Sequence, residues 1–290
     1  MEILRSYSFL TVAIGTLLLA ISTGMVGCIS VLKGQSLIGD AIGHSSYPGI
    51  IIAFILVMSK SPMALLIGAS IAGALAFLFI NLISNNSKID LDASLAIVLS
   101  SFFGFGMVLK SYIQGNQKFS GASQSGLQNY IFGQASFIIK SDINIILIVS
   151  IISISLIFLF YKEIKLYVFD EVYARSIGLN TAIINGVILI STMLLIATGL
   201  KLVGAILISS MLIVPAITAL QWSNKLSRVL LISAMVGGIS AILGTYISTL
   251  YKGMSTGATI ILIMSLMAFI SLIFGRKGFL NNLITRRRFG

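Results

Sequence analysis

The sequence predicts an all-α protein that crosses a lipid bilayer several times. Of its 290 residues, 57% are hydrophobic and 9% are charged, and its mean hydropathy is +1.07, whereas about a quarter of the residues in soluble domains are charged. The apolar residues are gathered in blocks of about 20, the length that a helix needs to cross a bilayer core of about 30 Å. Because backbone polar groups find no water in lipid, such blocks form helices rather than open sheets.

Nine apolar blocks qualify as spans. They cover residues 9–32, 37–59, 62–83, 93–113, 142–161, 182–200, 202–221, 228–250 and 255–275. The first block is too long for the apolar core of a signal peptide, so we expect a retained span. We expect residues 1–290 to form a single transmembrane domain.

Basic residues predict the orientation of the chain, because Lys and Arg are enriched in cytoplasmic loops. They gather in the loop 162–181 (Lys162, Lys165 and Arg175) and near the C-terminus (Arg276, Lys277 and residues 286–288). Both regions are therefore predicted to lie on the cytoplasmic side. Two segments on the same side of a membrane are separated by an even number of spans, and four blocks lie between these two. Five blocks precede the loop, so either the N-terminus is outside or one early block is re-entrant and the total is eight.

The segment 111–141 is the longest stretch without an apolar block, and it is polar but nearly uncharged. An external loop and a simple solvated linker explain this composition equally well.

Several functions are excluded by composition. The net charge of +11 comes from scattered cations without a basic face, so nucleic acid is not an expected partner. A lone cysteine, Cys28, excludes a disulfide or a cysteine-rich metal site within one chain. One histidine cannot form a His-Glu-x-x-His protease site, and the absence of any Gly-Lys dipeptide excludes a phosphate loop for ATP. We therefore expect a transport subunit rather than an enzyme.

The candidate metal ligands are Asp40 and His44. Asp40 alone of the eight acids lies in the interior of an apolar block, while the others, including Asp142 at the first position of its block, lie in or beside loops where we expect water to reach them. His44 follows four residues later, so both side chains share one helix face. An acid near mid-membrane costs about 2.5 to 3.5 kcal/mol and usually marks a transport route. The alternative is that the two side chains merely offset each other's burial.

A carboxylate and an imidazole suit Mn, Fe or Zn rather than Cu(I). Two copies related by a two-fold axis, the commonest symmetry of homo-oligomers, bring four such ligands together. Pro48 lacks the N–H that the His44 carbonyl accepts in a continuous helix. We expect a helix kink there rather than a carbonyl ligand, and we expect the pair to pass an ion on rather than to hold it permanently.

The loop 162–181 contains a predicted amphipathic helix at about 168–179. Asp170 suits its N-cap, Glu171 its first turn, Arg175 its last turn and Gly178 its end. Phe169, Tyr173 and Ile177 then form an apolar ridge that suits lipid headgroups or a groove on a partner protein.

Four segments resemble the permeases of manganese, zinc and iron ABC transporters, and together they extend over nearly the whole chain. In residues 36–49, SLIGDAIGHSSYPG, the matching positions are Asp40, Ala41, His44, Pro48 and Gly49. Residues 169–179 are similar to the segment that docks on the ATPase subunit in that family, and residues 203–216 and 256–262 are similar to its later spans. The sequence departs at Gly43, Ser45 and Tyr47, where the family usually has Ser, Ala and Leu.

The resemblance implies a type II ABC importer-like permease in the bacterial cytoplasmic membrane, with Asp40 and His44 lining the metal passage. It implies a homodimer or a pairing with a paralogous permease, a separate cytoplasmic ATPase and an external metal-binding protein. The ATPase-docking residues are then Phe169, Asp170, Glu171, Tyr173, Ala174, Arg175 and Gly178. Manganese or zinc is the expected cargo, iron is a further candidate, and no permanently bound cofactor is expected. The alternative is a proton-coupled secondary transporter that works without an ATPase.

Overall fold

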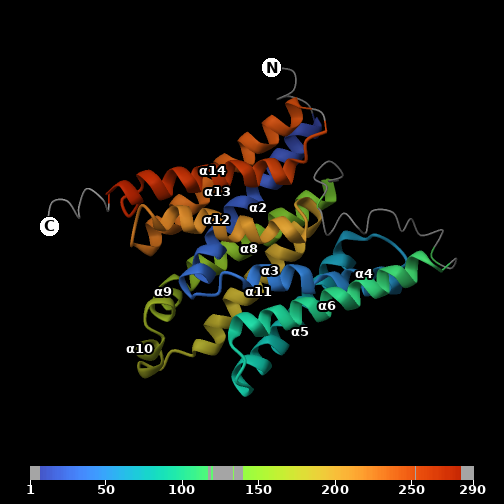
Figure 1. The fold of residues 1–290 in the computed structure, drawn as a ribbon, viewed down its shortest axis with the longest axis horizontal. Coiled ribbons are helices and arrows are strands. Elements are labelled where there is room, and N and C mark those ends of the chain that lie inside the picture. Colours follow the sequence, from blue (N-terminus) through green and yellow to red (C-terminus); the bar gives the residue numbers. More distant parts are fainter. Residues whose placement is uncertain (1–6, 117–118, 120–132, 134–139, 252, 282–290) are drawn as a thin grey trace.

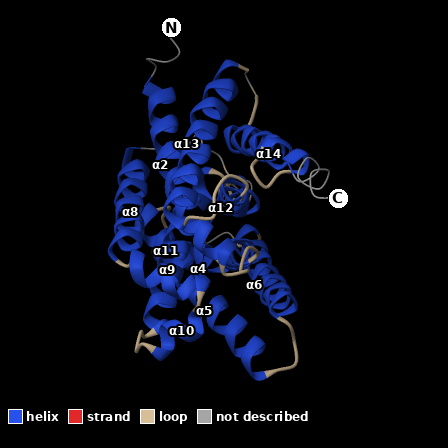
Figure 2. Cartoon of the chain, turned by 90° about the vertical axis from the view of Figure 1, so that its left-hand side faces the viewer, coloured by secondary structure: helices blue, strands red, loops and turns tan. Residues whose placement is uncertain are grey.

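The computed structural model describes residues 7–116, 119, 133, 140–251 and 253–281 (Figure 1). These residues form helices and connections without strands, as Figure 2 shows. The helices are α2 (Tyr7–Leu32), α3 (Ile38–Ser45), α4 (Tyr47–Val57), α5 (Pro62–Asn86), α6 (Leu91–Gln114), α8 (Lys140–Leu159), α9 (Tyr161–Phe169), α10 (Glu171–Ser176), α11 (Thr181–Leu202), α12 (Ala205–Leu220), α13 (Leu226–Leu250) and α14 (Thr256–Phe274). The predicted all-α class is confirmed.

Eight helical segments in the described part of the chain are long and apolar enough to cross a bilayer, with α3 and α4 counted together as one. The predicted block 202–221 forms α12, which has 16 residues and is about 24 Å long. It therefore falls short of a bilayer core of about 30 Å. The segment too short to cross the bilayer is therefore α12, in the second half of the chain, and not one of the five blocks before the loop 162–181.

The packing of α2 against α13 shows how the bundle is arranged. The hydroxyl oxygens of Thr16 and Thr245 lie 3.1 Å apart, and the Ser233 hydroxyl donates to the Gly24 carbonyl at 2.7 Å. Residue numbers rise along one helix as they fall along the other, so the two helices are antiparallel. Small side chains at these positions let the backbones approach closely, which is how helices associate where lipid replaces water.

The two regions predicted to be inside lie at the same end of the bundle, which we call the α10 end. Lys33, just after α2, forms an ion pair with Glu171 of α10 at 2.7 Å. The Lys277 N–H, just after α14, donates to the carbonyl of Gln221, which lies between α12 and α13. Because α13 begins where α2 ends, these contacts share one end. The prediction that the loop and the described C-terminal residues lie on one side is confirmed.

The start of α2 lies at the opposite end, since α2 runs toward the α10 end. With α12 added to the eight longer segments, nine helical segments of the described residues then alternate in direction through the bundle, which supports the alternative with the N-terminus outside. Most of the segment 111–141 lies outside the described residues. Its first four residues complete α6, and Gly133 lies against Val203 in the turn between α11 and α12, at the end opposite α10.

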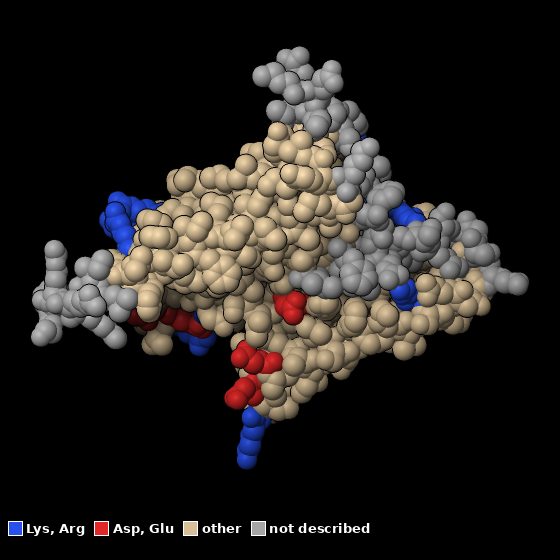
Figure 3. All heavy atoms as spheres, turned by 45° about the horizontal axis from the view of Figure 1, so that its top comes forward, with Lys and Arg blue, Asp and Glu red and all other residues tan. Residues whose placement is uncertain are grey.

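Charged side chains are sparse on the surface. Figure 3 shows a face on which they gather in a few places and leave broad uncharged areas between them. Large apolar side chains are exposed on the outer faces of the spans, among them Ile71, Leu78, Val108, Phe158 and Phe269. This surface suits contact with acyl chains.

Gly27 is a position where a side chain should disrupt the bundle. A Cβ atom built there would overlap the backbone carbonyl of Leu212 in α12. We expect Gly27→Val to push α2 and α12 apart and to destabilise the protein by about 1 to 3 kcal/mol, visible as a lower melting temperature in detergent. Gly104→Val is the matched control, because its Cβ meets no atom within 4 Å. Equal melting temperatures for the two variants would contradict this packing.

Candidate functional site

Asp40 and His44 lie on α3, which is surrounded by α5, α6, α11 and α12. Two glycines of α3 allow close packing, because a Cβ on Gly39 would lie 2.7 Å from Leu212 Cδ1 and a Cβ on Gly43 would lie 3.4 Å from Ile208. Leu212 is near the middle of α12, so α3 places its polar side chains within the length of the bundle and not at its end.

The two candidate ligands share one side of α3, as their spacing predicts. His44 Nε2 lies 3.7 Å from Asp40 Oδ1, beyond ordinary hydrogen-bond distance. The Asp40 side chain is 39% exposed and the His44 side chain 17% exposed. Because the carboxylate is open on one side and not engaged by a short bond to the imidazole, it keeps the capacity to bind a cation.

Asp40 and His44 by themselves are too few to complete a coordination shell. No cluster of three or more His, Cys, Asp or Glu side chains occurs among the described residues. Structural zinc sites have four ligands, and even catalytic sites have three from the protein. A site built on Asp40 and His44 therefore needs ligands from water or from a second copy.

The helix is divided at Ser46, between α3 and α4. Pro48 is the second residue of α4, and Ser46 bonds through both its N–H and its hydroxyl to the Ile42 carbonyl at 2.9 and 2.8 Å. The sequence predicted a kink at Pro48, and the structure divides the helix two residues before it. This division separates the part of the span that carries the ligands from its outer part.

The predicted amphipathic helix corresponds to α10, which is shorter than the predicted range of about 168–179, and a separate helix, α9, precedes it. Asp170 ends α9 and caps α10, where its Oδ1 accepts the Tyr173 N–H at 2.8 Å. Gly178 ends the turn with a φ of +85°, a conformation that glycine adopts without strain. The predicted cap and the predicted stop are confirmed, whereas α9, which ends at the same Asp170, was not predicted.

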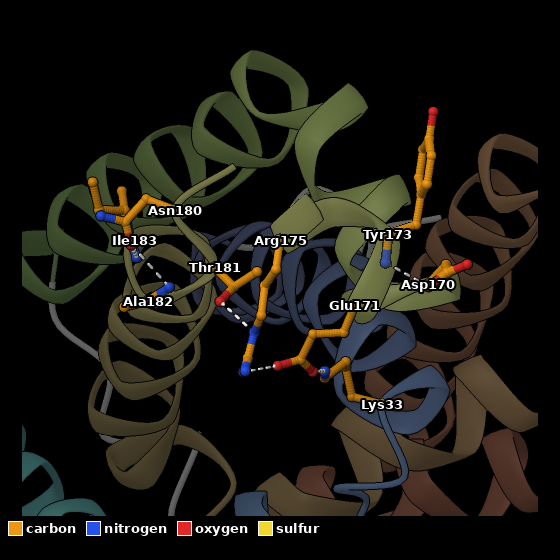
Figure 4. A network of polar contacts seen from close by, with 9 residues as sticks. All are labelled: Lys33, Asp170, Glu171, Tyr173, Arg175, Asn180, Thr181, Ala182 and Ile183. Carbon is orange, nitrogen blue, oxygen red and sulfur yellow. Dashed lines mark hydrogen bonds and ion pairs between the residues drawn. The ribbon is translucent and has the colours of Figure 1, made fainter. Parts of the chain in front are cut away.

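Ion pairs hold α10 against the bundle (Figure 4). Glu171 accepts from Lys33 at 2.7 Å and from Arg175 at 2.5 Å, and Arg175 also donates to Thr181. The hydrogen bond from Lys33 holds the pKa of the Glu171 carboxyl below its usual value, and Arg175 adds to the effect. The pair therefore stabilises the fold above the usual pKa of glutamate, and this contribution is lost as the pH falls through the lowered pKa.

One part of the exposed surface of α9, α10 and the turn after them is apolar. The side chains of Phe169, Tyr173 and Ile177 are each exposed by about half, as the predicted ridge requires, and Tyr173 points away from the ion pairs in Figure 4. Val172 is 80% exposed and belongs to this surface, which the i, i+4 pattern missed because it follows one line of residues only. We call these four residues the apolar ridge.

The remaining residues predicted for docking serve the fold of the segment itself. Ala174 is fully buried, Gly178 forms the turn, and Asp170, Glu171 and Arg175 bond within the chain. The structure thus brings all seven together in one segment, but of these it presents only Phe169 and Tyr173 as apolar contact residues.

The expectation that water reaches Asp142 is wrong. Its side chain is 8% exposed, in the first turn of α8, and its Oδ2 lies 2.5 Å from Lys201 Nζ of α11. A small cavity beside this pair is lined mainly by apolar residues of α4, α5, α8 and α11. The presence of Lys201 near the end of an apolar block is the one feature of the sequence that could have indicated a buried ion pair. The residues around Asp142 do not indicate that α11 packs over it.

Relatives share the sequence along its whole length. A manganese transport system membrane protein, MntC of Bacillus subtilis, is 41% identical over 91% of this chain, and the alignment spans 60% of that relative's length. A zinc transport system membrane protein, TroC of Treponema pallidum, is 35% identical over 99% of this chain and 96% of its own.

A solved structure shares the fold. PsaBC from Streptococcus pneumoniae, in complex with Fab, superposes with a TM-score of 0.83 at 30% identity, over 94% of each chain. The profile of the ABC 3 transport family matches residues 6–275, which include α3, the apolar ridge and all the spans. The chain therefore belongs to the ABC 3 transport family.

Proposed function

We propose that this chain is the membrane-spanning permease of an ABC importer that carries a divalent transition metal, manganese or zinc first and iron as a further cargo, across the bacterial cytoplasmic membrane. The observation that carries the proposal is the Asp40–His44 pair on α3, within the bundle of a chain from the ABC 3 transport family. A carboxylate oxygen and an imidazole nitrogen suit these borderline cations.

A second permease copy completes the metal site in this proposal. Each chain contributes one carboxylate and one imidazole, so a symmetric pair supplies four ligands. The 39% exposure of Asp40 supports this arrangement, because a carboxylate that is open in one chain is available to an ion shared with another. A paralogous permease that carries the same two side chains would serve equally.

Energy and cargo come from two other proteins. The chain has no phosphate-loop sequence, so a separate ATPase subunit drives transport, and it docks on the apolar ridge at the α10 end. An external metal-binding protein delivers the ion at the opposite end, where α2 begins.

Transport measurements in liposomes test the proposal. We expect uptake of radioactive manganese or zinc only when the permease, the ATPase and the binding protein are present together with ATP. Competition among Mn, Zn and Fe ions in the same assay ranks the cargo. Uptake by the chain alone, driven by a proton gradient, would contradict the importer.

The proton-coupled secondary transporter is the second candidate, and one observation favours it. Asp142 and Lys201 form a buried ion pair, and such groups in membranes often belong to proton relays. The family supports the importer, and the liposome assay separates the two because only one of them needs ATP.

Removal of the apolar ridge should uncouple the permease from its ATPase. We expect Phe169→Ala combined with Tyr173→Ala to lower the amount of ATPase that co-purifies with the tagged permease at least fivefold, since truncation of buried aromatic anchors weakens interfaces by about 2 kcal/mol or more. Tyr251→Ala is the control, because Tyr251 is 63% exposed at the opposite end of the bundle. Unchanged co-purification of the ridge variant would place the ATPase elsewhere.

A further inference from the structure

The two nitrogens of His44 have different surroundings. Nε2 lies 3.7 Å from the Asp40 carboxylate, on the side proposed for the metal. Nδ1 is buried and has no hydrogen-bond partner among the described residues. A histidine that ligates a metal almost always donates its other N–H to an acceptor, which fixes the tautomer and the ring orientation. An acceptor for Nδ1 is therefore required if Nε2 is to bind the ion.

Tyr47 supplies a suitable hydroxyl. It follows His44 by three residues, and because Ser46 between α3 and α4 keeps helical backbone angles (φ −73°, ψ −19°), side chains at this spacing remain neighbours. Both rings pack on Phe103 of α6, with centroid distances of 5.2 Å for His44 and 5.9 Å for Tyr47. Tyr47 is 1% exposed, and its hydroxyl is also buried without a partner among the described residues.

The bundle makes room for this phenol ring. A Cβ built on Gly106 of α6 would lie 2.8 Å from Tyr47 Cδ1, so only glycine fits opposite the ring. Ser45 also has a buried hydroxyl without a described partner, but one residue corresponds to about 100° of rotation around the helix. Ser45 therefore faces away from the side that carries His44 and Tyr47, and Gly43 offers no hydroxyl.

Leaving two polar atoms buried without partners is costly, and one water between them would satisfy both. We propose that Tyr47 is a positioning residue for the metal site: one bound water accepts the Nδ1–H of His44 and donates to the Tyr47 hydroxyl oxygen, which keeps the lone pair of Nε2 turned toward the metal. This inference rests on the proposed function and deepens it, because it makes Tyr47 a determinant of metal affinity.

Tyr47→Phe tests the inference, because it removes the hydroxyl and keeps the ring against Phe103. We expect the KM for manganese or zinc uptake by the complete transporter to rise about tenfold, because loss of a residue that orients a metal ligand usually lowers metal affinity about 10- to 100-fold. The melting temperature and the protein level should be unchanged. Equilibrium binding of the radioactive metal to the purified permease should weaken by a similar factor. Tyr47→Leu should show the same loss of affinity.

Tyr112→Phe is the matched control, since Tyr112 is 59% exposed on α6, and its KM should equal that of the wild type. A KM and a metal affinity within twofold of the wild type for both Tyr47 variants would overturn the positioning role. Asp40→Ala and His44→Ala belong in the same assay. If those two variants retain uptake, the metal site itself is misplaced; if they lose it while Tyr47→Phe behaves as the wild type, only the inference about Tyr47 fails.

Discussion

Asp40→Ala and His44→Ala are each expected to abolish metal uptake while leaving the protein inserted in the membrane. Each substitution removes one of the two proposed ligands. Loss of an outer partner alone lowers affinity or activity about 10- to 100-fold, so loss of a ligand should exceed about 100-fold. Insertion should persist, because both substitutions make an apolar span more apolar.

Uptake of radioactive manganese, zinc and iron by cells that produce each variant measures this effect, and the amount of protein in the membrane fraction is the control. Asp40→Asn is a useful companion, because it keeps the size of the side chain and removes its charge. It should retain less than about a tenth of the wild-type uptake, since a neutral amide is a weaker ligand than a carboxylate. Normal uptake of all three metals in both alanine variants would refute the assigned ligands.

Lys201→Met is expected to be among the most destabilising single substitutions in the chain. It leaves the Asp142 carboxylate, which is 8% exposed, beside a side chain without charge. Breaking a buried ion pair from one side costs about 3 to 5 kcal/mol. Because the Lys201 side chain is 26% exposed and partly screened, the expected loss lies near the lower bound.

The double substitution Asp142→Asn with Lys201→Met should recover most of the lost stability, because replacement of both charges removes the carboxylate that the single substitution leaves without the Lys201 countercharge. Melting temperatures in detergent for the wild type, both single variants and the double variant give the coupling between the two residues. Lys225→Met, at an exposed position between α12 and α13, is the control for a lost positive charge. Additive effects of the two single substitutions would show that the pair contributes nothing to stability.

Local patterns were enough to predict the helices and the ends of α10. Apolar blocks predicted each span because a bilayer sets both the length and the composition of a helix that crosses it. Asp170 and Gly178 predicted the start and the end of α10 because capping and a positive φ depend on residues a few positions apart. The spacing of Asp40 and His44 predicted a shared face for the same reason.

Contacts between distant parts of the chain could not be predicted in this way. The cover of α11 over Asp142, the ion pair of Lys33 with Glu171 and the shared contact of His44 and Tyr47 with Phe103 each join helices that are far apart in sequence. Val172 belongs to the apolar ridge only because α10 turns it outward while Ala174 faces the bundle.

The sequence by itself determined that this is an all-α membrane protein, where its spans lie, and that Asp40 and His44 share a helix face, because these properties depend on hydropathy and on the geometry of a single helix. The tertiary structure alone decided that Asp142 is buried, that α10 is tied to α2, and that within the described residues no further His, Cys, Asp or Glu forms a cluster with Asp40 and His44. Burial and coordination depend on which helices pack together. Helix packing in turn depends on the fit between side chains that are far apart in the sequence, which local patterns do not reveal.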